Sequence, residues 1–138
     1  MNKIVYDSAL MQVMALFESV THAVLKDCIK TNSGFVFVVA EHEIGKAVGA
    51  GGKNVRLLEH KLKARIKIVE FSDTPVSFIK NLIYPLQAVD VSFVDGVLVM
   101  AAPDSRTRGL LIGRGAETLR SYEAIVKRYF PVAEVRVE

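Results

Sequence analysis

Two short glycine segments carry the residues whose types and spacing best suit contact with a charged ligand. Each has a glycine, two further residues, and then glycine or alanine: Gly49 to Gly52 and Gly113 to Ala116. Glycine lacks a side chain, so a sugar-phosphate backbone can approach the main chain closely. Where such a segment opens a helix, free N–H groups and the positive end of the helix dipole favour an anion. The sequence therefore predicts two anion-contacting loops.

Polar and basic residues surround the first loop. Lys46 precedes it, and Lys53, Asn54 and Arg56 follow within about one helical turn. A lone glycine turn of this kind is explained equally well as a helix cap. Its repetition in a matching context favours a binding loop.

The second loop departs from this pattern. Arg114 lies inside it and Arg120 follows, but Ala116 replaces the last glycine and Glu117 comes next. Alanine tolerates left-handed backbone angles poorly, and Glu117 would compete with a phosphate for the same positive field. We therefore expect the first loop to bind more strongly and the second mainly to set direction and register.

Other chemistries fit the sequence poorly. A nucleotide-binding P-loop needs Ser or Thr where Gly52-Lys53 is followed by Asn54, and a dinucleotide loop needs a third glycine at that same position. The three histidines are scattered, without metal-ligand spacing or a catalytic set. We expect no enzyme activity, no cofactor and no metal.

Charge and composition point to a polyanionic partner. The 138 residues carry a net charge of +3 and are 51% hydrophobic. Seven basic residues fall between Gly45 and Glu70 against two acids, and seven fall between Ser105 and Glu138 against four. Clustered cations suit a polyanion, although exposed Lys-rich helices also arise for solubility alone. No apolar run is long enough to span a bilayer, the first residues lack a signal-peptide order, and we expect a cytoplasmic protein.

An internal repeat organises the chain. Residues 45–56 align without gaps on residues 109–120. In each half an amphipathic helix is followed by a hairpin, a short helix, the glycine loop, a second helix and a closing strand. The predicted strands are Lys26 to Thr31, Phe35 to Ala40, Arg65 to Glu70, Ala88 to Phe93, Val97 to Ala102 and Val132 to Val137.

The repeat predicts an α+β fold of two domains, residues 1–71 and 72–138. The amphipathic helix that opens the second half begins with Asp73 or Thr74 as N-cap and Pro75 in the first turn, and its apolar periodicity runs to Leu86. The connector, residues 71–74, is too short and too poor in glycine and serine for a flexible tether. We expect the two domains to be rigidly joined. The single cysteine, Cys28, is expected in the core.

The order of elements, with the glycine loop between the last two helices, resembles the type II KH fold. Residues 47–55, Ile66 to Val69, Pro75 with Phe78 to Asn81, and Ile112 to Gly115 resemble the tandem KH segment of the NusA transcription factors, over nearly the whole chain. The length is similar to that of the short archaeal NusA-like proteins, without the polymerase-binding and S1 domains of the bacterial factor.

This resemblance implies binding of single-stranded RNA and a part in transcription termination, antitermination or pausing. We expect a monomer, with RNA polymerase as a further partner. The alternatives are an assembly module docking on polymerase or ribosomal components, and a DNA-binding helix-turn-helix, which the duplicated loops disfavour. The candidate RNA contacts are Lys46, Gly49, Ala50, Gly51, Gly52, Lys53, Asn54, Arg56, Gly113, Arg114, Gly115, Ala116 and Arg120.

Overall fold

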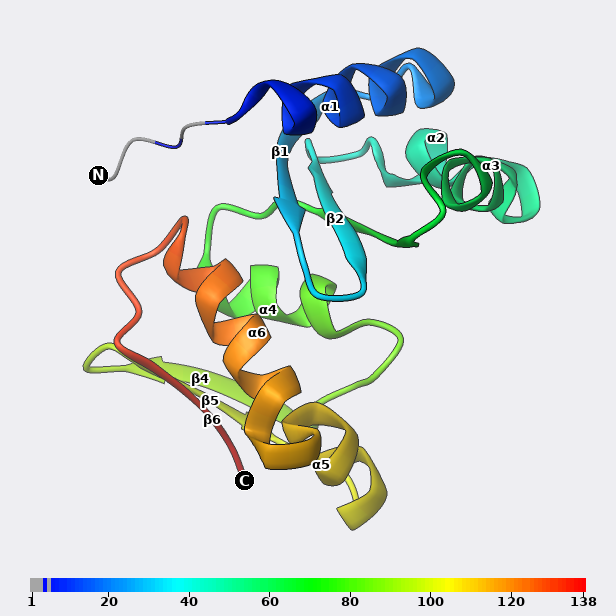
Figure 1. Cartoon of the computed structure of the whole chain (residues 1–138). Coiled ribbons are helices and arrows are strands. Elements are labelled where there is room, and N and C mark those ends of the chain that lie inside the picture. The colour runs from blue at the N-terminus through cyan, green and yellow to red at the C-terminus, as the bar shows by residue number, and fades with distance from the viewer. Residues whose placement is uncertain (1–3, 5) are drawn as a thin grey trace. The chain divides into compact units, whose positions relative to one another are not determined.

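The computed structural model describes Ile4 and residues 6–138 (Figure 1). The chain divides into two compact units, unit 1 of Met1–Phe71 and unit 2 of Ser72–Glu138. Each contains helices and a three-stranded sheet with one antiparallel and one parallel pairing. The predicted α+β class is confirmed, and the order of elements in each unit is the one that the repeat predicts. That each unit is an independent domain stays a prediction.

Unit 1 places its helices on one face of the sheet, which has the strand order β1-β2-β3 (Figure 1). Strand β2 pairs antiparallel with β1 and parallel with β3, so β3 lies at an edge. Its elements are α1 (Ser8–Thr21), β1 (Leu25–Lys30), β2 (Gly34–Val39), α2 (Ile44–Val48), the 3₁₀ turn η1 (Ala50–Gly52), α3 (Lys53–Leu62) and β3 (Arg65–Glu70).

The core of unit 1 lies between α1, α3 and the sheet. Phe17 of α1 stacks on Phe37 of β2 with ring centroids 4.3 Å apart, and both side chains are fully buried. Leu58 of α3 and Cys28 of β1 belong to the same cluster, which confirms the predicted place of the cysteine. Aromatic pairs of this kind contribute beyond their buried area, so they fix α1 against the sheet.

Unit 2 repeats this arrangement, with the strand order β4-β5-β6 and β6 at an edge. Helices α4, α5 and α6 lie on one side of its sheet in Figure 1. Its elements are α4 (Pro75–Ile83), β4 (Asp90–Val94), β5 (Val97–Ala101), α5 (Ser105–Ile112), the 3₁₀ turn η2 (Arg114–Ala116), α6 (Glu117–Lys127) and β6 (Glu134–Val137).

Element boundaries differ from the sequence prediction mainly around proline and loops. Thr74 is the N-cap of α4, since its hydroxyl accepts a hydrogen bond from the Ser77 N–H. The helix ends at Ile83, short of the predicted Leu86, because the residue before Pro85 is disfavoured in helical conformation. Strands β4 and β6 each begin two residues later than predicted. Among the described residues, no helix is long and apolar enough to cross a membrane.

Candidate functional site

The two glycine loops share one backbone conformation. Gly49 and Gly113 have φ/ψ of 78°/165° and 76°/176°, a region that only glycine adopts readily. Gly51 and Gly115 have 61°/22° and 60°/26°. The loops therefore present their main chains in the same way, although their sequences differ.

The last position of the loop is left-handed in both units. Gly52 has φ/ψ of 78°/19°, and Ala116 has 62°/21°. Ala116 thus adopts the conformation that its residue type tolerates poorly, at a cost of roughly 1–2 kcal/mol. The glycine at position 52 avoids this cost in unit 1.

The first glycine of each loop also lies close to a side chain of the following helix, most closely at Gly113. A Cβ on Gly49 would lie 3.0 Å from the side chain of Asn54, and one on Gly113 would clash with the Thr118 hydroxyl oxygen. A Cβ on Gly51 or Gly115 would meet nothing within 4 Å. The middle of each loop is therefore open, which is the property that close approach of a ligand needs.

Each loop opens a helix whose first turn has no side-chain cap. Helix α3 begins at Lys53 after Gly52, and α6 begins at Glu117 after Ala116; neither capping residue can donate or accept through its side chain. The first N–H groups of a helix have no partner inside it. The Lys53 N–H donates to the Ala50 carbonyl oxygen and the Glu117 N–H to the Arg114 carbonyl oxygen in the 3₁₀ turns. The N–H groups that follow in the first turn are therefore the ones that can meet an anion at the positive end of the helix dipole.

Two of the predicted contact residues hold the first loop in shape. The Asn54 Nδ2 donates to the Lys46 carbonyl oxygen at 3.1 Å, which joins α3 to the end of α2. The Arg56 Nη1 donates to the Gly51 carbonyl oxygen. Lys46, Lys53 and Arg56 are all exposed. Cations therefore surround a loop whose conformation is held by these two hydrogen bonds.

The second loop has a different electrostatic setting. Arg114 and Arg120 are exposed, and Arg120 lies 3.9 Å from the Glu123 carboxylate. Glu117 occupies the first turn of α6, where α3 has no acid. The negative charge at this helix start weakens the field that an incoming anion would meet.

A groove of about 310 Å³ lies beside the second loop in unit 2. Its lining joins two predicted residues, Ala116 and Arg120, to α5 and to the edge strand β6. Ile112, Leu119, Val135 and Val137 supply apolar side chains, and charged residues surround them. Sequence reasoning missed this groove because its walls come from segments far apart in the chain.

An ion pair borders that groove. The Arg136 Nε donates to the Glu134 Oε2 at 3.0 Å. This hydrogen bond lowers the pKa of the Glu134 carboxyl and raises the pKa of the Arg136 guanidinium. Both groups therefore stay charged near neutral pH, and they keep this part of the rim polar.

A carboxylate from the last helix caps the edge strand in both units. The Ile66 N–H donates to the Glu59 Oε2 at 3.3 Å, and the Val135 N–H donates to the Glu123 Oε2 at 2.9 Å. Glu59 and Glu123 occupy equivalent positions in the repeat. That equivalence was the signal in the sequence that could have identified them as structural residues.

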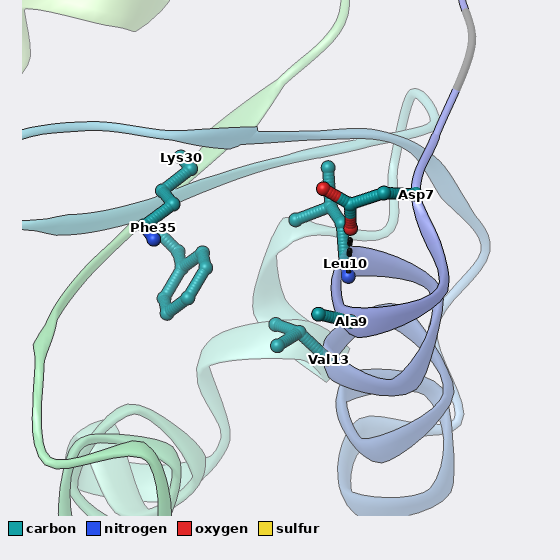
Figure 2. A pocket seen from close by; sticks show the side chains of 6 residues that line it. All are labelled: Asp7, Ala9, Leu10, Val13, Lys30 and Phe35. Atoms are coloured by element: carbon teal, nitrogen blue, oxygen red, sulfur yellow. Dashed lines mark hydrogen bonds between the residues drawn. The ribbon is translucent and has the colours of Figure 1, made fainter.

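A second, smaller cavity of about 120 Å³ lies in unit 1. Figure 2 shows Lys30 and Phe35 of the β1–β2 hairpin across from the first turn of α1, where the Asp7 carboxylate accepts the Leu10 N–H. Leu10 and Val13 face the cavity, and none of the predicted contact residues lines it. Among the described residues, no three His, Cys, Asp or Glu side chains are placed to hold a metal ion.

The chain is similar in sequence to several known archaeal proteins. No known family profile matches it. The probable transcription termination protein NusA of Halococcus morrhuae is 32% identical over 133 residues, covering 95% of each chain. The protein of the same description from Methanocaldococcus jannaschii is 28% identical over 127 residues, covering 90% of this chain and 69% of that relative.

A solved structure is similar in fold over nearly the whole chain. The crystal structure of APE1850 matches with a TM-score of 0.74 and 26% identity, covering 93% of this chain and 96% of that one. The resemblance drawn from the glycine loops is thus confirmed over nearly the whole chain. The chain belongs to the family of archaeal proteins described as probable transcription termination protein NusA.

Proposed function

We propose that the chain consists of two tandem type II KH domains that bind single-stranded RNA, and that it acts in transcription termination, antitermination or pausing. The observation that carries the proposal is the pair of glycine loops with one backbone conformation, each opening an uncapped helix. The family supports the role in transcription termination.

The loop and the groove suit two different parts of a nucleotide. A phosphate docks at the first turn of α3 or α6, because the N–H groups after Lys53 or Glu117 and the helix dipole favour negative charge. A base then lies against apolar side chains such as Ile112 and Leu119 in the groove of unit 2. Single-stranded RNA exposes both parts at once, whereas a duplex hides its base faces.

The two loops contribute unequally in this proposal. The first has Lys53 and Arg56 beside it and no acid in the first turn of α3, whereas the second has Glu117. Replacing Ala50 and Gly51 with aspartate should therefore cost more RNA affinity than the same change at Arg114 and Gly115. A larger loss from the second pair would contradict this ranking.

The function is tested by titrating the chain with single-stranded RNA, single-stranded DNA and duplex DNA at two salt concentrations. We expect the tightest binding to the RNA, with affinity falling as salt rises because each phosphate contact releases a counterion. Equal binding to duplex DNA would overturn the proposal.

The competing function is an assembly module that docks on RNA polymerase or ribosomal components. Leu110 supports it, since this side chain is 48% exposed on α5 where the repeat has Lys46 in unit 1. Absence of binding to any nucleic acid, together with loss of polymerase binding on Leu110→Lys, would favour the assembly module.

A further inference from the structure

The exposed face of α3 carries cations well beyond the first glycine loop. The cations are Lys53, Arg56, Lys61 and Lys63, all of them exposed, and the exposed side chains of His60 and Leu57 lie among them. We name Lys53, Arg56, His60, Lys61 and Lys63 the α3 strip. They fall into two rows at helical spacing, one through Lys53 and Lys61 and the other through Arg56, His60 and Lys63. The strip runs from the loop to the end of the helix, about 15 Å at 1.5 Å per residue.

The cations of the α3 strip are not neutralised by acidic neighbours. In the part of the chain that the structure describes, no Asp or Glu carboxylate forms an ion pair with them. The one acid on α3, Glu59, is turned to the edge strand, where it accepts the Ile66 N–H. The strip is therefore a concentrated positive surface.

Helix α6 provides an internal comparison, because the repeat places it in the same position. Where α3 has Lys53 and His60, α6 has Glu117 and Ala124. Lys127 is the counterpart of Lys63, and its Nζ lies 3.5 Å from the Glu123 carboxylate. A requirement for solubility would apply equally to both helices, so it does not explain why only α3 keeps unpaired cations.

The helix dipole does not explain the strip either. It favours cations at the C-terminal end, which accounts for Lys61 and Lys63, but disfavours Lys53 and Arg56 at the N-terminal end. Arg56 offsets this by its hydrogen bond to the Gly51 carbonyl oxygen, whereas no hydrogen bond or ion pair explains the Lys53 side chain among the described residues. A cation at this position suits a ligand with negative charge.

We infer that the α3 strip binds the phosphate backbone of the same RNA as it leaves the first glycine loop, extending the contact along α3. The inference rests on the proposed RNA-binding function. An acidic protein surface is the weaker alternative, because lysine is depleted and aromatic residues are enriched in protein interfaces, and the strip has three lysines and no aromatic residue other than His60. The strip is about 15 Å long, which leaves room for phosphates beyond the one at the glycine loop.

The experiment compares the binding of short and long RNA. All variants also carry Arg114→Asp and Gly115→Asp, which abolish RNA binding by the second loop. The test variant carries Lys61→Gln and Lys63→Gln, both away from the glycine loop. The control carries Lys80→Gln and Lys127→Gln, which change the net charge equally. Fluorescently labelled single-stranded RNAs of random sequence, six and twelve nucleotides long, are titrated at several salt concentrations, with circular dichroism to check folding.

We expect the test variant to bind the six-nucleotide RNA like the control and the twelve-nucleotide RNA several-fold more weakly. The salt dependence of the longer RNA should fall by about 1.4 in log–log slope, or 0.7 for each lost phosphate contact. Equal affinity of test and control variants for the long RNA would overturn the inference alone, as would an equal loss on both lengths. Failure of the unaltered chain to bind either RNA would overturn the proposed function itself.

Discussion

The first residues of α3 and α6 carry opposite charges, and reversing each charge distinguishes its effect on stability from its effect on RNA binding. Lys53 is the first residue of α3 and Glu117 the first of α6, each directly after its loop. We consider Lys53→Glu and Glu117→Lys as separate variants. Stability and RNA affinity should move in opposite directions in each.

The size of the effect follows from the helix dipole. A charge in the first turn changes stability by about 0.3–1 kcal/mol at low ionic strength. Lys53→Glu removes an unfavourable charge and adds a favourable one, so the free energy of unfolding should rise by about 1 kcal/mol. Glu117→Lys should lower it by about the same amount. For a unit of this size, ~1 kcal/mol corresponds to about 4–8 °C in Tm.

Thermal unfolding at low salt and RNA titration at several salt concentrations measure the two properties. Lys53→Glu should unfold at higher temperature yet bind RNA more weakly, with a salt slope reduced by about 0.7. Glu117→Lys should unfold at lower temperature and bind more tightly. If Lys53→Glu lowered both Tm and affinity, its weaker binding would reflect a damaged fold, and the dipole argument would be refuted.

Three further predictions test the local geometry. Ala116→Gly should raise the free energy of unfolding by about 1 kcal/mol by relieving the left-handed alanine, and Gly52→Ala should lower it comparably in denaturant titrations; no change in either would contradict the strain. Asp104→Ala should lower the Tm, since the Thr107 N–H donates to this N-cap carboxylate at 2.6 Å. That hydrogen bond lowers the pKa of Asp104, so its stabilisation is fully present above the ordinary carboxyl pKa of about 3.9 and is lost as the pH falls through the lowered pKa. A Tm difference between wild type and variant that does not shrink as the pH falls would argue against it. Glu123→Ala should cost about 1–3 kcal/mol by leaving the Val135 N–H without its acceptor, whereas Glu123→Gln should keep most of the stability; an equal loss in both would show that the charge, and not the hydrogen bond, matters.

The sequence was sufficient to predict the loops and the order of elements. Glycine spacing, apolar periodicity and a proline at a helix start are local signals, and the repeat let each half check the other. A cap at Asp73 or Thr74 and a strand from Arg65 to Glu70 followed from such signals, and the structure has the cap at Thr74.

Side-chain partners could not be predicted in the same way. Asn54 and Arg56 suit a phosphate by residue type, but in the fold they brace the loop through the carbonyls of Lys46 and Gly51. Glu59 and Glu123 reach N–H groups 7 and 12 residues away, across connections of different length. Such contacts depend on how helix and strand meet, which composition and spacing do not encode.

The carboxylates of Glu59 and Glu123 also affect the tendency of the chain to aggregate through its sheet edges. Strands β3 and β6 lie at the edges of their sheets, and an uncovered edge can recruit a strand from another molecule. A buried or half-buried carboxylate on the second residue of the strand occupies one outward N–H and places negative charge along that edge. Edge-to-edge aggregation is thereby disfavoured without closing the groove beside the strand.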